Sequence, residues 1–163
     1  MATQDQGTPD IFLKHVFVYA REGDLRRLKL CLDHRPREEV SRLVSAKTYG
    51  ATPLVMSCMN GHQEVVEYLV DKCCASLEQP GSVTFNGETT DAPPLWCAVI
   101  AGHLDIVKLL VKSGANVNTK TKTKITPLLA ACFSGHHEIV KYLVEHNAGI
   151  GPWTLNIGIC WLL

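Results

Sequence analysis

The strongest constraint on the fold is a stretch that the sequence repeats. Residues 92–110 contain a Pro-Pro-Leu segment and, eight positions after its second proline, a Gly-His pair. Both features return 33 positions later, at Thr126-Pro127-Leu128 and Gly135-His136. They also occur 41 positions earlier, at Thr52-Pro53-Leu54 and Gly61-His62. Such a chain is expected to fold as a row of similar units, with eight extra residues between two of them.

Each unit carries the signals of two helices. Thr52 and Thr126 are suited to cap a first helix, which begins with a proline and ends at the repeated glycine. The second helix has apolar residues at helical spacing, so a neighbour must cover one of its faces. These residues are Val65, Val66 and Leu69, then Ile106, Val107 and Leu110, then Ile139, Val140 and Leu143. A period near 33 residues is typical of ankyrin repeats.

The pattern predicts an all-α ankyrin-repeat solenoid of about four repeats, with a β-hairpin insertion and a non-repeat apolar tail. Asp24 should cap the second helix of an atypical first repeat, and residues 36–44 predict a short additional helix. Within an ankyrin domain at 11–148, we expect a capping repeat at 11–46, repeats at 47–78, 92–118 and 125–148, and a hairpin at 79–91. A disordered leader at 1–10 and a divergent apolar tail at 149–163 should flank this domain.

The insertion at 79–91 has the composition of a hairpin. Ser82-Val83-Thr84-Phe85 favours a strand, and Asn86-Gly87 is the strongest signal for a two-residue turn. A tolerated surface loop is the alternative. The aromatic side chain of Phe85 beside the turn favours a contact with a partner or a neighbouring groove, so we expect a binding finger.

Lysine alternates with threonine in residues 119–125. On an extended arm, Lys120, Lys122 and Lys124 would share one side. Exposed strand edges often carry lysine, which favours a solvated edge. The functional alternative is a local site for acidic groups.

The repeat pattern ends after residue 148. Residues 149–163 are apolar and uncharged, whereas a terminal repeat needs a polar outer face. Either this tail folds back over the fourth repeat, or the sequence is a shortened product whose repeats continue in a longer relative. We favour truncation. A hydrophobic, uncharged tail is also an aggregation hazard.

Composition limits the partners and the compartment. The 16 basic and 16 acidic side chains balance, so no overall field favours nucleic acid or a membrane surface. Seven cysteines without a signal peptide predict a reducing compartment, cytoplasmic or nuclear. No run approaches the ~20 apolar residues that cross a bilayer. No cofactor is expected.

Catalysis is disfavoured. The best candidate pair is Cys132 with His136, but Val99 occupies the position of Cys132 in its own repeat, which marks a core position. His62, His103 and His136 occur once per repeat, without the spacing of zinc ligands. Structural hydrogen bonding at the helix turn is therefore expected of them. The sequence predicts neither an enzyme nor a metal site.

Several segments resemble the amino-terminal repeats of the Fem (feminisation) family. They are Gly50-Ala51-Thr52-Pro53-Leu54, Gly81-Ser82-Val83-Thr84-Phe85-Asn86-Gly87-Glu88-Thr89, Ala92-Pro93-Pro94-Leu95-Trp96, Thr126-Pro127-Leu128, Ala130-Ala131-Cys132-Phe133 and residues 138–146. The resemblance covers about residues 12–148, and the segment 83–89 in this place is specific to the family.

The resemblance implies a substrate receptor of a cullin-based ubiquitin ligase. In that family, the ankyrin groove binds the carboxyl terminus of target proteins, often one that ends in arginine. An elongin-binding box then couples the receptor to the ligase. This sequence contains no such box, so we expect capture of a ligand without direct recruitment of elongin or cullin.

By position and by resemblance, the expected peptide-binding residues are Phe85, Asn86, Trp96, Ile125, Leu129, Cys132 and Ser134. The family has aspartate where Asn86 and Ser134 stand, so two carboxylates suited to a guanidinium are missing. It has Asn-Ser and arginine where Lys124-Ile125 and Leu129 stand. These differences should make the groove less negative and alter or impair peptide specificity. The alternative function is a degenerate scaffold or dominant-negative fragment that recruits no ligase.

Overall fold

The computed structural model describes residues 11–85 and 87–149. Its elements follow in the order α1 (Ile11–Glu22), α2 (Leu25–Leu32), α3 (Arg37–Ser45), α4 (Pro53–Met59), α5 (Gln63–Asp71), β1 (Gly81–Phe85), β2 (Glu88–Ala92), α6 (Pro94–Ile100), α7 (Leu104–Lys112), α8 (Pro127–Phe133) and α9 (His137–Glu145). The expected leader at 1–10, Asn86 and all but the first residue of the expected tail lie outside the described residues.

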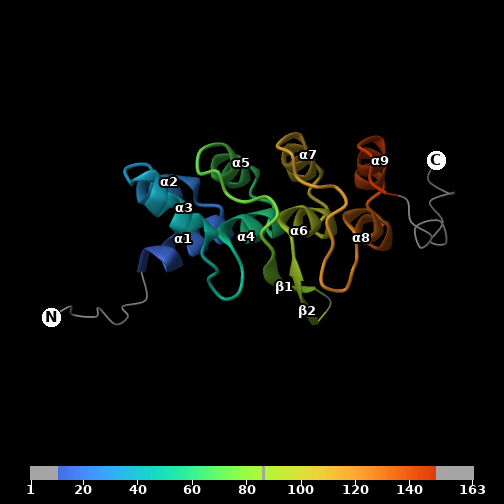
Figure 1. Cartoon of the computed structure of the whole chain (residues 1–163), viewed down its shortest axis with the longest axis horizontal. Coiled ribbons are helices and arrows are strands. Elements are labelled where there is room, and N and C mark those ends of the chain that lie inside the picture. Colours follow the sequence, from blue (N-terminus) through green and yellow to red (C-terminus); the bar gives the residue numbers. More distant parts are fainter. Residues whose placement is uncertain (1–10, 86, 150–163) are drawn as a thin grey trace.

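The helices stack in two layers. Figure 1 shows an inner layer of α1, α4, α6 and α8 and an outer layer of α2, α5, α7 and α9, with the hairpin projecting from the inner layer. Helix pairs connected by short turns follow one another along the stack, which is the arrangement that the repeat predicted. The described residues therefore form an ankyrin solenoid with one antiparallel hairpin.

The predicted caps begin the inner helices. Oγ1 of Thr52 accepts a hydrogen bond from the backbone N–H of Val55 at 3.3 Å, and Oγ1 of Thr126 accepts one from Leu129 at 3.3 Å. Asp24 caps α2 in the same way, accepting from the N–H of Arg27 at 2.9 Å. Each bond satisfies a donor that the first turn of a helix leaves unpaired. The short inner helices therefore start at fixed residues.

The core lies between neighbouring repeats. In the inner layer α4 packs against α6 and α6 against α8, and in the outer layer α5 packs against α7 and α7 against α9. Every residue of α6 is buried, because this helix has an inner-layer neighbour on both sides. The nine apolar residues predicted to form the covered face of the second helices are all buried, which confirms the helical spacing inferred from the sequence.

Histidines join successive repeats at the inner turns. A Cβ atom added to Gly61 would lie 2.6 Å from Cε1 of His103, and Gly102 meets His136 in the same way at 2.8 Å. Gly23 faces the ring of His62, whose Nε2 donates to the carbonyl of Arg21 at 2.8 Å.

Nε2 of His136 likewise donates to the carbonyl of Ile100, at 3.3 Å. Each ring therefore occupies space that a side chain on the preceding repeat would fill. The structural role expected of these histidines is confirmed by the hydrogen bonds of His62 and His136.

The segment before α8 differs from the sequence expectation. Residues 119–125 form no strand, and the chain turns at Lys122 and Thr123. The N–H of Thr121 donates to the carbonyl of Ile125 at 3.1 Å, and Lys124 adopts a φ of 63°. Oγ1 of Thr121 also accepts from the N–H of Ile125 at 3.2 Å, a local bond that stabilises a turn over an extended chain. The expected extended arm with three lysines on one side was wrong.

The histidine contacts predict different costs for two glycine substitutions. Gly61 and Gly135 have φ values of 79° and 70°, but no described atom lies within 4 Å of a Cβ added to Gly135. Gly135→Ala should lower the free energy of unfolding by about 1–2 kcal/mol, the cost of a left-handed L-residue. Gly61→Ala should cost more, because the ring of His103 must move. Urea unfolding of both variants measures the difference.

The His103→Ala background provides the control. Without the ring, Gly61→Ala should cost no more than Gly135→Ala does in the wild-type chain. Equal costs for the two single variants would show that the histidine contact does not constrain the turn.

Candidate peptide-binding surface

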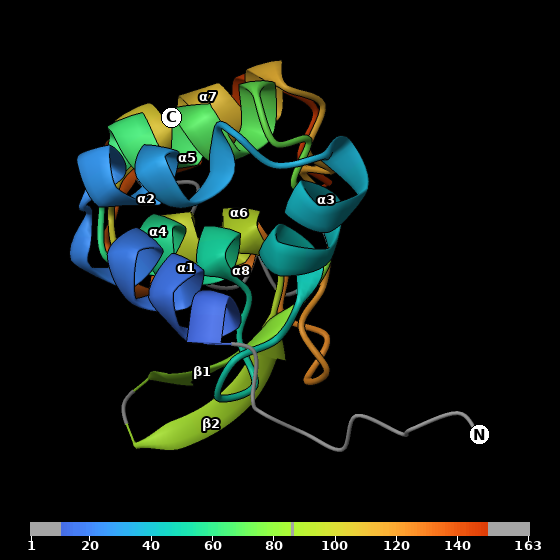
Figure 2. The same cartoon turned by 90° about the vertical axis from the view of Figure 1, so that its left-hand side faces the viewer.

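The hairpin extends one edge of the inner layer. Its strands pair antiparallel from Gly81 with Ala92 to Phe85 with Glu88, and Gly87, just before the second strand, has a φ of 83°. The predicted hairpin is thus confirmed. Figures 1 and 2 show the hairpin and the loops before α4 and α8 on one side of the inner helices, and we call this the finger side.

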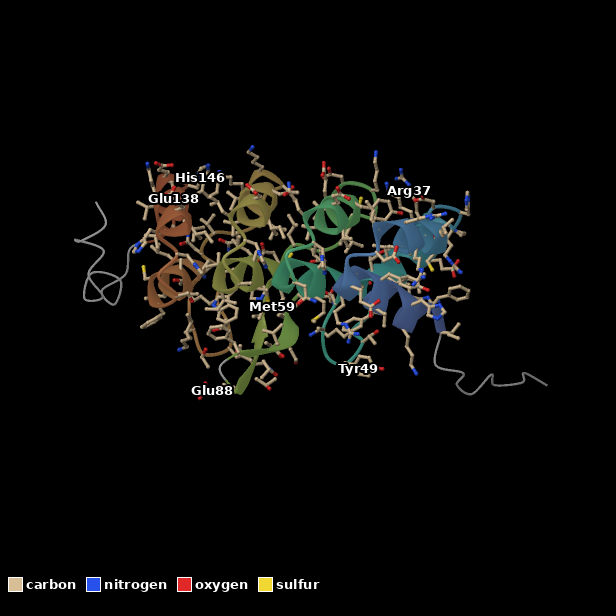
Figure 3. The ribbon with its side chains drawn as sticks, turned by 180° about the vertical axis from the view of Figure 1, so that it is seen from behind. Arg37, Tyr49, Met59, Glu88, Glu138 and His146 are labelled. Carbon is tan, nitrogen blue, oxygen red and sulfur yellow. The ribbon has the colours of Figure 1, made fainter. Side chains whose placement is uncertain are left out.

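Figure 3 separates the finger side from the outer layer. Tyr49, in the loop before α4, and Glu88, at the end of the hairpin, lie at one edge of the molecule. Arg37, Glu138 and His146 lie toward the opposite edge. The finger side is therefore a distinct surface, built from the segments in which the repeats differ most from one another.

Phe85 is held against the first helix that follows the hairpin. Its ring centroid lies 6.4 Å from that of Trp96 in α6, at an interplanar angle of 89°. Such edge-to-face pairs add to the stabilisation from buried area. Trp96 is 4% exposed, whereas Phe85 is partly exposed, so Phe85 covers Trp96. The structure brings these two predicted site residues together, with Phe85 as the accessible one.

The indole N–H of Trp96 has no described partner. Its Nε1 is buried and makes no hydrogen bond within the residues that the structure describes. A buried donor without an acceptor costs about 1–3 kcal/mol. An additional acceptor at the junction of the hairpin and α6 would therefore satisfy the indole N–H of Trp96.

The remaining predicted residues gather on α8 and at its ends. Leu129 and Cys132 are three positions apart, so they share a helix face, and both are partly exposed. Ser134 caps the carboxyl end of α8, where its N–H donates to the carbonyl of Ala130 at 3.0 Å. Ile125 precedes α8 and is partly buried. Asn86 lies outside the described residues. The α8 group stands beside α6, because the two helices pack together.

An ion pair that was not predicted ties the hairpin to the loop before α8. Nζ of Lys122 lies 2.6 Å from Oδ2 of Asp91, and Oγ of Ser82 donates to Oδ1 of Asp91 at 2.5 Å. The hydrogen bonds from Lys122 and then Ser82 hold the pKa of the Asp91 carboxyl below its ordinary value. Asp91 and Lys122 are far apart in the sequence, and the pairing depends on the turn that places Lys122, so no local pattern indicated it.

A recess lies at the base of the hairpin, one repeat toward the amino terminus. It has a volume of about 440 Å³ and is lined from α1, α4, β1 and the loop before α4 by Phe17, Arg21, Tyr49, Ala51, Met56, Met59, Asn60, Ser82, Val83 and Thr84. In the sequence, the three-residue spacing of Met56 and Met59 is the pattern that could have indicated this recess. Methionine adapts to irregular partners, so the recess suits side chains of varied shape.

An exposed tyrosine borders this recess. Tyr49 is 77% exposed, at a φ of 53°, and its ring lies 5.7 Å from that of Phe17. Large exposed apolar side chains are enriched at protein interfaces. Together with Phe85, Tyr49 gives the finger side two accessible aromatic rings.

The chemistry of the surface favours binding. Burial raises the pKa of the Cys132 thiol, so the neutral thiol predominates at neutral pH. Within the described ranges, no three His, Cys, Asp or Glu side chains are grouped to hold a metal ion. None of the helices described here combines the length and apolarity that spanning a bilayer requires. Partly exposed aromatic and aliphatic groups beside exposed lysines can hold a polypeptide.

The comparisons with known protein families agree with the stack. Residues 16–121 match ankyrin repeats in three copies, and residues 123–152 match a further ankyrin repeat. The chain therefore belongs to the ankyrin-repeat proteins. Members of this class are protein-binding modules, and the finger side is the surface of this chain that departs from the regular stack.

Among ankyrin proteins, the chain is similar to the Fem-1 homologues. It is 61% identical over 112 residues to protein fem-1 homolog CG6966 of Drosophila melanogaster, and 56% identical over 109 residues to human protein fem-1 homolog C. Rat protein fem-1 homolog A is 51% identical over 115 residues. These matches cover 68%, 66% and 69% of this chain, and 17%, 18% and 18% of the relatives. The resemblance to the Fem family is confirmed, and the chain spans less than a fifth of these relatives.

The Asp91–Lys122 pair predicts the direction of a pKa change. Lys122→Met should raise the pKa of the Asp91 carboxyl toward its ordinary value, and only partway because Ser82 still donates. Lys120→Met removes the same charge from an exposed neighbour and should leave this pKa unchanged. Carboxyl titration by NMR measures both. A pKa that is insensitive to Lys122→Met would show that the two side chains do not pair in solution.

The lowered pKa of Asp91 also determines how the pair's contribution to the free energy of unfolding depends on pH. Because the folded-state pKa of Asp91 is lowered, the pair stabilises the fold above the unfolded-state pKa and loses this effect as the pH falls through the folded value. The side chain of Lys122 is 76% exposed, so the contribution should stay below about 1 kcal/mol. Urea unfolding of the wild type and Lys122→Met at neutral and acid pH should therefore converge at the acid end.

Proposed function

We propose that this chain is a peptide-binding module that captures the carboxyl-terminal segment of a target protein on its finger side. The observation that carries the proposal is the contact between Phe85 and Trp96, which fixes a partly exposed aromatic ring where the hairpin meets the inner helices. Rigid aromatic groups are the residues that most often dominate binding energy at protein interfaces. The similarity to Fem-1 homologues, with the carboxyl-terminal ligands that the family resemblance implies, supports the choice of ligand.

The charges on the finger side suit a peptide carboxylate. Lys120 and Lys124 are exposed, and Lys122 extends beside them toward the hairpin. A carboxyl terminus adds one negative charge at the end of a peptide, which such lysines attract. The recess beside the hairpin, which offers both apolar and polar side chains, would take side chains that precede this terminus.

The same charges disfavour a ligand that ends in arginine. Asn86 and Ser134 stand where the Fem pattern has aspartates, and Asp91 is already paired with Lys122. A charge-assisted hydrogen bond contributes about 1.5–3 kcal/mol, so the absence of two weakens a guanidinium ligand by orders of magnitude. We infer that the preferred carboxyl termini carry neutral or apolar side chains.

The similarity to Fem-1 homologues also suggests a cellular role for the captured proteins. We propose that captured proteins are presented to a cullin-based ubiquitin ligase, as the family resemblance implies, with the contacts to elongin and cullin made by other regions of such receptors. On this proposal the module works in the cytoplasm or nucleus, binds protein rather than nucleic acid or membrane, and is not an enzyme.

A displayed library of carboxyl-terminal peptides tests the proposed binding. The wild-type chain should retain a subset of peptides, and amidation of their carboxyl termini should abolish retention. Phe85→Ala should weaken binding about tenfold or more, as expected for an aromatic anchor. Leu30→Ala, which removes an exposed side chain from α2, is the matched control and should have no effect. Retention that survives both amidation and Phe85→Ala would refute the proposal, and no retention would favour a non-binding scaffold.

Placing aspartate at positions 86 and 134, as in the Fem pattern, tests the proposed discrimination against arginine-ended peptides. A labelled arginine-ended peptide should bind the wild-type chain more weakly than micromolar. In the double variant Asn86→Asp and Ser134→Asp it should gain about a hundredfold, because each restored charge-assisted bond contributes at least about tenfold. Adding the same charges at exposed serines, Ser76→Asp and Ser113→Asp, is the control. Micromolar or tighter binding by the wild type would contradict the inferred specificity.

A further inference from the structure

The two edges of the hairpin differ in what lies beside them. The edge of β2 faces the loop before α8, which reaches it through Lys122 (Figure 1). The edge of β1 faces the loop before α4, and there the backbone N–H of Ser82 donates to the carbonyl of Gly50 at 2.9 Å. The start of the β1 edge is therefore already paired with another segment of the chain.

The next outward backbone groups of this edge belong to Thr84. In an antiparallel ladder the outward groups come from alternate residues, so Thr84 presents its N–H and C=O to the same edge as Ser82. The hydroxyls of Thr84 and Thr89 lie 3.0 Å apart, as expected of the closer pairs that share no backbone hydrogen bond. In the part of the chain that the structure describes, neither backbone group of Thr84 has a partner. Thr84 is exposed, so this edge offers an open donor and an open acceptor.

The recess at the base of the hairpin lies along the same edge. Ser82, Val83 and Thr84 form one of its walls, and the loop before α4 contributes Tyr49 and Ala51. A chain segment that pairs with the open groups of Thr84 would therefore pass directly beside the recess.

The apolar part of the recess lies on the side of the hairpin that faces the inner helices. Val83 points to this side and is 5% exposed, whereas its neighbour Thr84 points to solvent. Met56 and Met59 of α4 and Phe17 of α1 line the recess there. The volume of about 440 Å³ is within the range of small-molecule sites, so the recess can hold one or two large side chains.

The loop before α4 holds an exposed ring at this edge. Thr48 and Ala51 exchange backbone hydrogen bonds of 2.9 and 3.2 Å. Between them, Tyr49 and Gly50 have φ values of 53° and 83°. A left-handed conformation is unfavourable for a residue with a side chain, and such strain is often found at functional sites. Here it keeps the ring of Tyr49 at the rim of the recess, 5.7 Å from the ring of Phe17.

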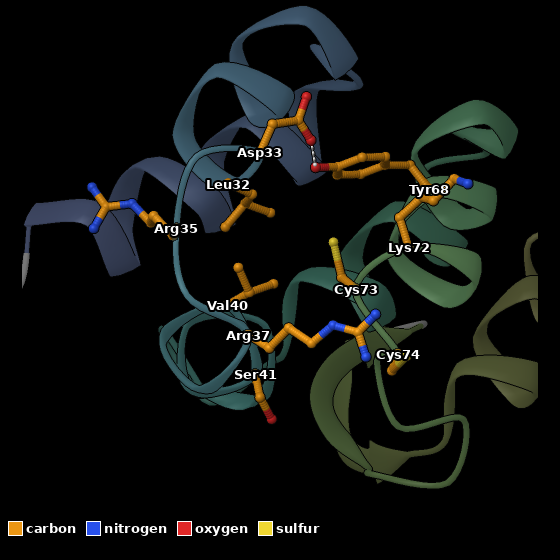
Figure 4. A pocket seen from close by; sticks show the side chains of 10 residues that line it. All are labelled: Leu32, Asp33, Arg35, Arg37, Val40, Ser41, Tyr68, Lys72, Cys73 and Cys74. Atoms are coloured by element: carbon orange, nitrogen blue, oxygen red, sulfur yellow. Dashed lines mark hydrogen bonds between the residues drawn. The ribbon is translucent and has the colours of Figure 1, made fainter.

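The hollow beside α3 and Arg37 offers a ligand no comparable edge. It has a volume of about 310 Å³ and opens between the connection from α2 to α3, the start of α3 and the end of α5, as Figure 4 shows. Its carboxylate, Asp33, accepts a hydrogen bond from Tyr68 at 2.5 Å, and no strand contributes to its described lining. The lining residues are Leu32, Asp33, Arg35, Arg37, Val40, Ser41, Tyr68, Lys72, Cys73 and Cys74. Of the two hollows, the recess beside β1 is the one that a strand edge borders.

We propose that the edge of β1 binds the segment that precedes the carboxyl terminus of the captured protein as an additional, parallel strand. The inference rests on the proposed function and adds how the backbone of the ligand is held. An open donor beside an open acceptor is the pattern that an extended polypeptide satisfies, and strand addition to a sheet edge is a common mode of peptide recognition.

The parallel direction follows from what blocks the edge. Gly50 occupies the edge at Ser82, so an antiparallel ligand would meet the loop before α4 with the residues that lead to its terminus. A parallel ligand instead continues past Phe85, and its terminus stays on the finger side.

Parallel pairing assigns a role to each of three ligand residues. The residue opposite Val83 donates its carbonyl to the N–H of Thr84 as acceptor, and its side chain points into the recess. The residue opposite Thr84 points to solvent. The residue opposite Phe85 donates its N–H to the carbonyl of Thr84. The ligand therefore needs an apolar side chain and, two residues later, a free backbone N–H.

Backbone methylation tests the ligand side of this pairing. The probes are synthetic copies of peptides that the wild-type chain retains from the library of carboxyl-terminal peptides. Methylating one backbone nitrogen at a time removes an N–H and leaves every side chain unchanged. One position should lose affinity about tenfold, the effect of one lost hydrogen bond, and it should lie two residues after an apolar side chain. The positions directly before and after it should change less than about threefold.

Proline variants of the hairpin test the protein side. Thr84→Pro removes the N–H that donates to the ligand, and Thr89→Pro removes the outward N–H of the β2 edge. Both variants lose the same contact between hydroxyls, and neither loses a bond between the two strands. Thr84→Pro should weaken peptide binding about tenfold, whereas Thr89→Pro should change it less than about threefold. Thr84→Val keeps the N–H and should bind as the wild type does. Thermal unfolding confirms that the variants are folded.

Three results would overturn the strand pairing and leave capture of the carboxyl terminus standing. They are binding that responds to methylation at no position, binding that Thr84→Pro leaves unchanged, and equal losses for Thr84→Pro and Thr89→Pro. Amidation of the peptide terminus reports on that capture separately. Failure of the wild-type chain to retain any peptide would overturn both the pairing and the proposed function.

Discussion

The structure depends on burial between neighbours, because no helix pair in the stack can cover its own apolar face. Short inner helices of seven residues, such as α4 and α6, are too short to be stable alone. Both are held by a left-handed glycine at the carboxyl end and by the helices on either side, and α4 also by the Thr52 cap at its start. At these inner turns, a histidine of one repeat fills the space beside the glycine of the preceding repeat and so fixes how the two repeats align. A repeat is therefore positioned as much by its neighbour as by its own sequence.

This mode of stabilisation explains where the chain tolerates irregularity. The hairpin and α3 both interrupt the period, yet each leaves from a turn between repeats, so the contacts of α4 with α6 and of α1 with α4 are kept. The hairpin gains its own support from the Phe85–Trp96 contact and from the Asp91 carboxylate, which binds Ser82 and Lys122. Insertions are therefore anchored to the stack at few points and add surface without altering the core.

Sequence reasoning succeeded where one residue determines local geometry and failed where distant segments meet. Thr52, Thr126 and Asp24 cap helices through a bond three residues away, and the pairing of 81–85 with 88–92 follows from the adjacent residues Asn86-Gly87, so each was predictable. The alternation of lysines was misleading, because the side chain of Thr121 stabilises a turn that periodicity alone does not reveal. The Asp91–Lys122 pair, the recess beside Met56 and the cavity beside Arg37 each combine residues from separate elements, whose juxtaposition only the folded stack fixes.

The two hollows share an origin that bears on how such a stack acquires function. Within a regular repeat each apolar side chain has an equivalent neighbour, and α6, which lies between α4 and α8 with Phe85 over its Trp96, is buried at every residue. A departure from the period removes this equivalence. The hairpin places Val83 and Thr84 opposite Met56, and α3 places Val40 and Arg37 opposite Cys73. Candidate binding surfaces therefore arise where inserted segments meet repeats that have no matching partner for them.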